Sequence, residues 1–278
     1  MSHLKDWIGR SETREEPLDL ARAEALRVTL ESLDPPVAEG TPLPELWHWA
    51  YFWDYAPLSQ VGHDGHAARG GFLPPVPLPR RMWAGSRFEW LLPLRLGTPV
   101  RKTSTIASIE EKQGRSGPLV FVTVRHELEG PEGLAIREEH DIVYREASKT
   151  GSPARAPGEA ALQGRWARPL RPDPLLLFRY SALTFNGHRI HYDAPYVTRE
   201  EGYPDLVVHG PLLATLMVDL ARREAPERQL AAFRFRALRP VFCGEEIVVG
   251  GEPDTKGAEV WVAGPDGGLC MRGRLEFK

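Results

Sequence analysis

Cysteine is nearly absent from this 278-residue chain, which contains only Cys243 and Cys270. Two thiols do not build a disulfide framework, and they nearly exclude a structural zinc site made of thiolates. An excess of positive charge is also lacking: the formal net charge is −3, which argues against a general nucleic-acid binder. No apolar run approaches the roughly 20 residues that span a bilayer, and the polar start MSHLKDWIGRSETREE lacks the apolar middle of a secretory signal. We therefore expect a cytoplasmic protein without nucleic-acid or membrane partners.

The sequence signatures of several common enzyme classes are missing as well. There is no GxGxxG after a strand, no phosphate-binding GKS or GKT loop and no GxSxG elbow. Nicotinamide, ATP and serine-hydrolase chemistry therefore lack their usual support. What is present is an ordinary globular composition, with 42% apolar and 26% charged residues. A chain of this length and composition can bury a core and suits two domains.

Proline and glycine, 26 of each, are concentrated in two stretches, 56–86 and 148–174. Repeated proline resists both a helix and a central strand, and structureless stretches of this length are usually functional loops or linkers. We predict that 148–174 links an N-terminal half, residues 1–147, to a C-terminal half, residues 175–278. We interpret 56–86 as a long loop that wraps a neighbouring surface.

The two halves repeat one order of elements. Residues 85–112 and 119–146 predict a strand, a glycine turn, a second strand and a β-hairpin, and residues 230–252 and 258–277 predict the same series. The matching positions are Phe88 with Phe233, Trp90 with Phe235, Gly97 with Gly244, and the turn PEG with PDGG. Either an internal duplication or the shared turn chemistry of antiparallel meanders explains the repeat.

One helix precedes the strands of each half. Residues 17–33 place leucine and alanine on one stripe, and residues 210–223 open with Gly-Pro and end with two arginines, as the two ends of a helix prefer. The second helix is apolar or small on nearly every face, so we expect a sheet to enclose it. A long central helix wrapped by an antiparallel sheet, twice in one chain, predicts the α+β class and a double hotdog.

Residues 185–193, FNGHRIHYD, gather two histidines and an aspartate behind an asparagine. In a metal site, His188 and His191 would be joined by Asp193 or His209, but no HExxH element or cysteine pair supports one, and we predict no metal. A second interpretation is a loop of satisfied polar groups. The apolar runs on both sides favour a third, a partly desolvated catalytic cluster with shifted pKa values.

The segments RYSALTFNGHRIHYDAPYV (179–197) and EGYPDLVVHGPLLATLM (201–217) resemble the hydratase-2, or MaoC-like, family of hotdog proteins. The resemblance extends across nearly the whole chain, including LPPVPLPRRMWAGS (73–86). The N-x-H-x-I-H-x-D and HGPL motifs look like one branch, which contains mitochondrial-type 3-hydroxyacyl-thioester dehydratases and bacterial hydratases for mesaconyl-C4-CoA, methylfumaryl-CoA and itaconyl-CoA. The resemblance implies a double hotdog whose N-terminal half is catalytically degenerate and whose C-terminal half carries the active site.

Hydration of an enoyl thioester needs three functions, and these segments offer candidates for each. A group must activate water at the β-carbon, a proton must reach the α-carbon, and donors must hold the thioester oxygen as it becomes enolate-like. We predict that His191 is the acid–base group, that Asn186 orients water, and that backbone N–H groups around Gly210 bind the oxyanion. Asp193 would orient the imidazole or face the substrate if residues 190–193 are extended.

The sequence departs from the wider family at this motif. The family pattern D-x-N-P-x-H places an aspartate five positions before the histidine, where this chain has Asn186 before His191. His188 and Arg189 occupy the Asn-Pro positions. Because an amide cannot take up a proton, base chemistry would move to His191 or to another residue.

The substrate implied by the resemblance is a CoA thioester with a short, branched or carboxylated acyl group. Arg189 is a candidate for a bidentate pair with an acyl carboxylate, or else for a CoA phosphate or a structural acid. Arg80 and Arg81 are candidates for the CoA phosphates, with a solvated basic loop end as the alternative. The remaining predicted substrate-binding residues are His188, His209 and Tyr180.

Two further segments have open interpretations. WHWAYFWDY (47–55) predicts a core strand of the N-terminal half or the lining of a tunnel for pantetheine or a short acyl chain. GHDGH (62–66) has two histidines four positions apart. A glycine-rich loop gives that spacing no fixed face, so we predict no metal there.

We therefore predict a hydro-lyase that adds water reversibly to a short dicarboxylyl-CoA, itaconyl-CoA or mesaconyl-C4-CoA, giving citramalyl-CoA, as in itaconate degradation. A 3-hydroxyacyl-thioester dehydratase of fatty-acid synthesis is the second prediction. A hotdog protein that binds acyl-CoA without turnover is the third, because Asn186 stands where a carboxylate is expected. No cofactor is expected, since coenzyme A is part of the substrate. Hotdog sheets pair edge to edge, which leaves a homodimer open.

Overall fold

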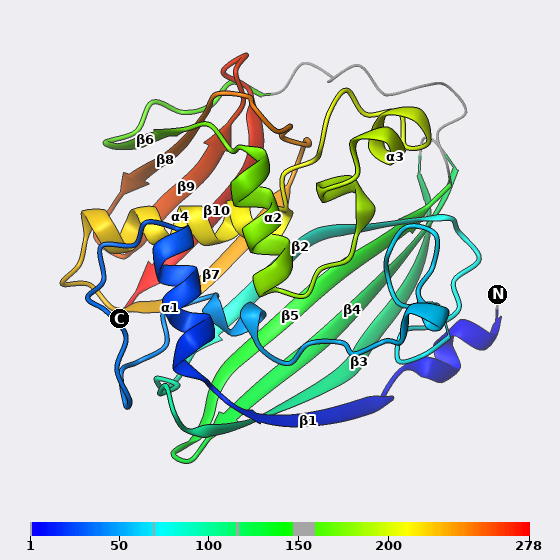
Figure 1. Ribbon diagram of the computed structural model, residues 1–278, viewed down its shortest axis with the longest axis horizontal. Coiled ribbons are helices and arrows are strands. Elements are labelled where there is room, and N and C mark those ends of the chain that lie inside the picture. Colours follow the sequence, from blue (N-terminus) through cyan, green and yellow to red (C-terminus); the bar gives the residue numbers. More distant parts are fainter. Residues whose placement is uncertain (1, 69, 115–116, 147–158) are drawn as a thin grey trace.

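One antiparallel sheet of ten strands forms the frame of the molecule in the computed structural model (Figure 1). The structure describes residues 2–68, 70–114, 117–146 and 159–278. The strands follow the order β1-β3-β4-β5-β2-β7-β10-β9-β8-β6, so the N-terminal strands form one end of the sheet and the C-terminal strands the other. The α+β class is as predicted, but the two expected sheets are joined into one.

The described residues form ten strands, of which the sequence predicts eight and does not predict those at 11–17 and 166–170. Those of the N-terminal half are β1 Ser11–Pro17, β2 Arg80–Trp90, β3 Pro99–Gly114, β4 Gly117–Gly130 and β5 Gly133–Arg145. Those of the C-terminal half are β6 Trp166–Leu170, β7 Leu230–Ala237, β8 Ile247–Pro253, β9 Gly257–Ala263 and β10 Leu269–Phe277.

The strand β6 corrects the expected extent of the linker. The proline-rich stretch 148–174 predicts no regular structure, yet Trp166–Leu170 pairs with β8 as the outermost strand. Pro169 is tolerated there because an edge strand donates to a ladder on one side only. Residues 147–158 of the linker lie outside the described residues, and the division of the chain into two halves stays a prediction.

The halves meet where β2 pairs with β7. Phe88 lies opposite Phe233, its counterpart in the sequence repeat, and the two rings stack with centroids 6.2 Å apart. Because Phe88 pairs with its own counterpart, the two halves are related by an approximate twofold arrangement at this point. Gly85 permits the close approach, since a Cβ there would lie 2.2 Å from the carbonyl oxygen of Phe235.

Among the residues described, four α-helices pack with the sheet: α1 Leu20–Thr29, α2 Pro174–Leu183, α3 Ala194–Arg199 and α4 Gly210–Glu224. Short 3₁₀ turns cover Ser2–Trp7, Trp47–Ala50, Leu58–Gln60 and Arg189–His191. No helix in the described ranges is long and apolar enough to cross a membrane.

The helix α4 is the enclosed helix that the sequence predicts. All residues from 212 to 221 are buried, and α4 lies across β6, β8, β9 and β10 (Figure 1). Asp219, the one acidic residue of this stretch, pairs with Arg168 at 2.8 Å and with Arg223 at 2.6 Å. A buried charge needs such partners, so the two arginines make an aspartate acceptable in an otherwise apolar core.

The helix α1 is shorter than the predicted 17–33 and lies in a different place. Asp19 begins it by accepting the backbone N–H of Arg22 at 2.9 Å, and α1 then packs on α2 and on the 47–50 turn. It does not run along the N-terminal strands as α4 runs along the C-terminal ones (Figure 1). The expectation of a central helix in each half is therefore wrong for the N-terminal half.

The aromatic segment 47–55 forms no strand, contrary to one of its two interpretations. It makes one 3₁₀ turn and then continues without regular structure. Trp47 and Tyr51 are buried in the main core, whereas Trp49, Phe52 and Tyr55 line a large cavity. These three rings line a cavity, and its use as a tunnel for pantetheine or a short acyl chain stays a prediction.

Candidate active site

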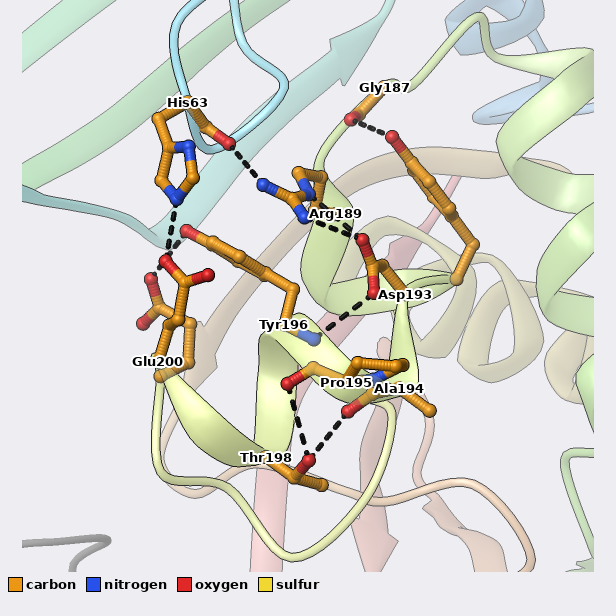
Figure 2. A network of polar contacts seen from close by, with 11 residues as sticks. His63, Gly187, Arg189, Asp193, Ala194, Pro195, Tyr196, Thr198 and Glu200 are labelled. Carbon is orange, nitrogen blue, oxygen red and sulfur yellow. Dashed lines mark hydrogen bonds and ion pairs between the residues drawn. The ribbon is translucent and has the colours of Figure 1, made fainter.

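Residues 184–200 form a compact unit that consists of one 3₁₀ turn followed by α3. The carboxylate of Asp193 begins α3 by accepting the backbone N–H of Tyr196 at 3.1 Å. Figure 2 shows Asp193 held between that N–H and the guanidinium of Arg189, whose Nη2 lies 2.8 Å from the carboxylate. The expected extended conformation is therefore wrong, and Asp193 is turned to Arg189 rather than to His191.

His191 is buried in this unit and is held in one tautomer. Its Nδ1 lies 2.7 Å from the backbone carbonyl oxygen of Val207. That oxygen can only accept, so Nδ1 carries the proton and Nε2 keeps its lone pair. Burial lowers the pKa of His191 to about 4, against a smaller opposing effect of the hydrogen bond. At neutral pH the ring is an uncharged base, as the catalytic interpretation requires.

His209 lies directly against His191. The two rings stack with centroids 3.8 Å apart, and Nε2 of His209 lies 2.8 Å from Oγ of Ser181. Within the described part of the chain Nδ1 of His209 has no hydrogen-bond partner, and burial lowers the pKa of this ring well below its ordinary value. The buried ring of Tyr180 packs against His209 at 5.1 Å and also lines the cavity. Of these two predicted substrate-binding residues, His209 packs on His191 and Tyr180 packs on His209.

Asn186 borders the cavity, and Gly210 is the first residue of α4. The side-chain oxygen of Asn186 accepts the backbone N–H of His188 at 3.0 Å, which closes the turn and leaves the amide NH₂ for other contacts. Gly210 opens α4, and the first N–H groups of a helix have no partner within the helix. A Cβ at Gly210 would lie 3.3 Å from the ring of Trp83, so a side chain would crowd the helix start. Their catalytic roles stay predictions.

The GHDGH loop of the N-terminal half folds over this unit. The backbone N–H of Arg189 donates to the carbonyl oxygen of Asp64 at 2.9 Å. The guanidinium of Arg189 donates to the carbonyl oxygen of His63 at 3.1 Å, as Figure 2 shows. Gly65 lies directly on Gly187, because a Cβ at Gly65 would be 1.8 Å from the carbonyl oxygen of Gly187. Only glycine at position 65 permits the loop to lie this close.

The loop places an aspartate and a histidine against His188. Oδ2 of Asp64 lies 3.0 Å from Nδ1 of His66, and the ring centroids of His66 and His188 are 4.1 Å apart. Among the described residues, the potential ligand atoms of these three side chains lie within 4.8 Å of one another. We expected the glycine-rich loop to leave the orientation of its histidines undefined. This is wrong for His66, whose ring is oriented by its packing on the motif. The absence of a metal stays a prediction.

A cavity of about 1350 Å³ lies between this unit and the inner face of the N-terminal strands. It occupies the side of the sheet that an enclosed helix fills in the C-terminal half. His66, Asn186 and Gly187 border it on the side of the motif. The polar side chains of its sheet wall include Glu12, Arg14, Arg81, Lys102, Ser104, His126, Glu138, His140 and Tyr144.

Glu138 is a buried carboxylate in this wall. It receives hydrogen bonds from Nε1 of Trp49 at 3.3 Å and Oγ of Ser86 at 3.4 Å, and its Oε2 lies 3.2 Å from Nε2 of His48. Burial by itself raises the pKa of a carboxyl group, but the hydrogen bond with His48 and the neighbouring histidines hold the pKa of Glu138 well below its usual range. The wall therefore contains a fixed negative charge.

Arg81 and Lys102 bring positive groups to the same wall. Within the described ranges neither the guanidinium of Arg81 nor the ammonium of Lys102 forms an ion pair. Burial lowers the pKa of Lys102. Arg80, the neighbour of Arg81 on β2, is instead paired with Glu201. Successive strand residues point to opposite faces, so only one of the two arginines reaches the cavity.

Comparison with known proteins assigns this architecture to a family. The model of the family described as hydroxyacyl-thioester dehydratase type 2 matches residues 46–243. The chain belongs to this family. It is 47% identical over 274 residues to mesaconyl-C(4)-CoA hydratase of Chloroflexus aurantiacus, covering 98% of this chain and 96% of that protein. It is 28% identical over 272 residues to the mitochondrial hydroxyacyl-thioester dehydratase type 2 of Schizosaccharomyces pombe, covering 88% of this chain and 87% of that protein.

Membership of the hydroxyacyl-thioester dehydratase type 2 family confirms two predictions, the hydratase-2 resemblance and the enzyme class, a hydro-lyase. A solved double-hotdog protein of Mycobacterium tuberculosis is similar in fold, with a TM-score of 0.57 and 14% identity. The alignment covers 97% of this chain and 96% of that one. At this identity the likeness concerns the fold alone, and it confirms the double hotdog.

In this member of the hydroxyacyl-thioester dehydratase type 2 family, the side chain of Arg189 binds other residues of the 184–200 unit. Its Nε and Nη2 lie 3.0 and 2.8 Å from the carboxylate of Asp193, and its guanidinium lies over the ring of Tyr196 at 4.2 Å. It is not among the residues that line the cavity. Of the roles predicted for Arg189, the pairing with a structural acid is the one that this geometry supports.

The polar cavity wall and the Asp64–His66 pair are features that sequence reasoning missed. The strands do contain a signal for the wall, because residues two positions apart share a face. The inward face of two strands carries such polar pairs where apolar residues would otherwise face a core. They are Lys102 with Ser104 on β3, and Glu138 with His140 on β5. No local pattern identifies Asp64 and His66, because their partner motif lies more than a hundred residues further along the chain.

We expect Gly65→Ala to lower kcat/KM for the enzyme's substrate roughly 10- to 100-fold, because a displaced loop misplaces the motif it contacts. The new Cβ would clash with the carbonyl of Gly187, and the φ of +89° adds backbone strain. Gly133→Ala is the matched control, since Gly133 has a φ of +114° but no atom within 4 Å of the place that its Cβ would take. Equal activity of the two variants in a steady-state assay would show that the close approach of the loop does not matter.

Proposed function

We propose that this protein adds water reversibly to a short dicarboxylyl-CoA, mesaconyl-C4-CoA or itaconyl-CoA, giving citramalyl-CoA. The observation that carries the proposal is Arg81, a cation without an ion pair among the described residues in the wall of a cavity bordered by the motif. The relative from Chloroflexus aurantiacus bears the name of such a hydratase. A site for an unsubstituted acyl chain is lined mostly by apolar groups, whereas an acyl carboxylate requires a positive partner.

The motif and the start of α4 supply the base, the water-orienting amide and the oxyanion donors that hydration requires. Nε2 of His191 accepts a proton from water as the water oxygen attacks the β-carbon. Backbone N–H groups at the start of α4, around Gly210, hold the thioester oxygen while negative charge develops on it. The amide of Asn186 orients the water. Coenzyme A enters as part of the substrate, and the reaction needs no further cofactor.

The charges of the cavity wall favour an anionic acyl group. Arg81 and Lys102 face this space and would attract an acyl carboxylate, whereas the buried anion Glu138 would repel it, so the acyl carboxylate is expected at the two cations. A substrate carboxylate would give Arg81 the bidentate partner that a guanidinium prefers. It would also favour the charged form of Lys102, whose pKa burial lowers.

The test mixes the pure protein with three thioesters in parallel. Loss of the conjugated-thioester ultraviolet band reports turnover of mesaconyl-C4-CoA and crotonyl-CoA, and chromatographic detection of citramalyl-CoA reports turnover of itaconyl-CoA, whose double bond is not conjugated with the thioester. We expect kcat/KM for a dicarboxylate to exceed that for crotonyl-CoA by about 100-fold, the range that a charge-assisted hydrogen bond provides. Comparable rates on all three thioesters would contradict the dicarboxylate assignment.

A second candidate is a 3-hydroxyacyl-thioester dehydratase of fatty-acid synthesis. The family description and the relative from Schizosaccharomyces pombe favour this class. Faster turnover of crotonyl-CoA would support it. Tight binding of all three thioesters without turnover would instead identify a non-catalytic acyl-CoA-binding protein. The cytoplasmic location and a homodimer stay predictions.

A further inference from the structure

We propose that Asp64 and His66 form the second half of the acid–base machinery and replace, from the N-terminal half, the carboxylate that the motif lacks at Asn186. His66 is the proton donor to the α-carbon and therefore a catalytic residue, and Asp64 is its positioning residue. This inference rests on the proposed function, the hydration of an enoyl-CoA. It also gives the N-terminal half a direct part in catalysis.

Hydration moves two protons, and His191 accounts for only one of them. In the tautomer fixed by Val207, Nε2 of His191 accepts the proton that water loses, but it has no proton of its own to give. The amide of Asn186 cannot act as an acid at neutral pH. The α-carbon therefore needs another donor close to the motif.

Asp64 fixes His66 in the orientation of such a donor. Oδ1 of Asp64 accepts the backbone N–H of His66 at 3.0 Å, and Oδ2 lies 3.0 Å from its Nδ1. Although burial alone would raise it, the contact with His66 holds the pKa of Asp64 well below its usual range. An ionised carboxylate on Nδ1 stabilises the imidazolium form that a proton donor requires. His66 also borders the cavity.

His188 lies between the two proposed catalytic rings. Its centroid is 4.1 Å from that of His66 and 5.3 Å from that of His191. Burial lowers the pKa of His188 far below its ordinary value, so this ring stays neutral and can both accept and donate a proton. It therefore offers a path between the acid and the base.

The cycle is balanced in atoms and charge. An O–H bond of water breaks, its proton goes to Nε2 of His191, and the oxygen bonds to the β-carbon. The electron pair of the double bond moves towards the thioester oxygen, and the α-carbon then takes the proton from Nε2 of His66. The proton on His191 returns to His66 through His188 or solvent, and both rings end as they began.

The variants that test the proposal are Asp64→Asn and His66→Gln. We expect kcat to fall about 100- to 1000-fold in His66→Gln, the usual contribution of a general acid, with KM changed less than about threefold. His63→Gln is the matched control and should keep kcat. The imidazole of His63 is exposed to solvent and pairs with Glu200. The carbonyl oxygen of residue 63, which accepts from Arg189, is kept in the variant. Added imidazole should restore part of the activity of His66→Ala, which a merely structural role would not allow.

The pH profile gives a second readout. Among the described residues, the titratable groups near His66 include Asp64 on its own loop and His188 and His191 on the motif, and Arg81 on β2 acts on the neighbouring His188. Wild-type kcat should fall on the alkaline side, where His66 loses its proton. His66→Gln should lose this alkaline limb and keep the acidic limb that His191 imposes.

Two outcomes would overturn the inference while the proposed function stands. One is full kcat in both Asp64→Asn and His66→Gln with a wild-type protein that hydrates enoyl-CoA. The other is a stoichiometric metal ion that wild-type protein binds, that His66→Ala loses and whose chelation abolishes turnover, since Asp64, His66 and His188 would then be ligands. A folded wild-type protein that hydrates none of the thioesters would overturn the proposed function and this inference together.

Discussion

His191→Ala is expected to lower kcat/KM for the preferred enoyl-CoA by about 10³-fold, within the range for loss of a general base. The variant removes the neutral Nε2 that activates water, while the cavity and its charged wall remain. Binding of a saturated, unreactive thioester such as succinyl-CoA, measured by calorimetry, should therefore change little. A kcat/KM within tenfold of the wild type would show that another residue is the base.

His191→Asn separates the chemical role of the ring from its structural one. The asparagine Nδ2 can replace Nδ1 as the donor to the carbonyl oxygen of Val207, so the contact that orients residue 191 is kept. Asparagine has no basic nitrogen, and we expect the same loss of turnover with less loss of thermal stability than in His191→Ala. Activity retained in His191→Asn would reduce the role of His191 to packing.

The sign of the pH dependence follows from the lowered pKa of His191. The base must be neutral, and burial brings its pKa to about 4. Wild-type kcat/KM should therefore hold down to about pH 4 and fall below it, instead of falling near the ordinary histidine value of about 6.5. An acidic limb near pH 6.5 would mean that His191 is solvated in the working enzyme.

Arg81→Met is expected to reduce the preference for a dicarboxylyl-CoA rather than abolish activity. We expect kcat/KM for mesaconyl-C4-CoA to fall about 10- to 100-fold, because a hydrogen bond to a charged group contributes about 1.5–3 kcal/mol. Crotonyl-CoA has no acyl carboxylate, so its kcat/KM should stay within about threefold. The ratio of the two values, measured with the ultraviolet assay, is the quantity to compare.

Two matched variants locate the effect. Arg80→Met removes the neighbouring guanidinium, which is paired with Glu201, and should affect both substrates equally. Lys102→Met removes another cation of the wall. A selective loss in Lys102→Met with none in Arg81→Met would place the acyl carboxylate nearer to β3. If Arg81→Met lowered kcat/KM equally for mesaconyl-C4-CoA and crotonyl-CoA, Arg81 would not be the residue that binds the acyl carboxylate.

Secondary structure that depends on the pattern of neighbouring residues could be predicted from the sequence. Eight of the ten described strands and α4 follow from alternation, glycine turns and an all-round apolar helix, and each of these signals lies within about 20 residues. The motif at 185–193 was identified in the same way, from titratable groups set between apolar runs. The conformation inside the motif was not predictable, because Asp193 caps α3 and pairs with Arg189 in place of an extended run.

Sequence alone thus determined eight of the ten described strands, the enclosed helix and the position of the histidine motif, but not β1 or β6. Only the tertiary structure decided which side chains share the site. The GHDGH loop reaches the motif because Gly65 and Gly187 let two backbones touch across more than a hundred residues, and this contact brings Asp64 and His66 to His188. Likewise Arg81, and not Arg189, faces the cavity, because α1 packs on α2 and leaves the inner face of the N-terminal strands open. Contacts of this kind depend on how distant surfaces fit together, and no local periodicity encodes that fit.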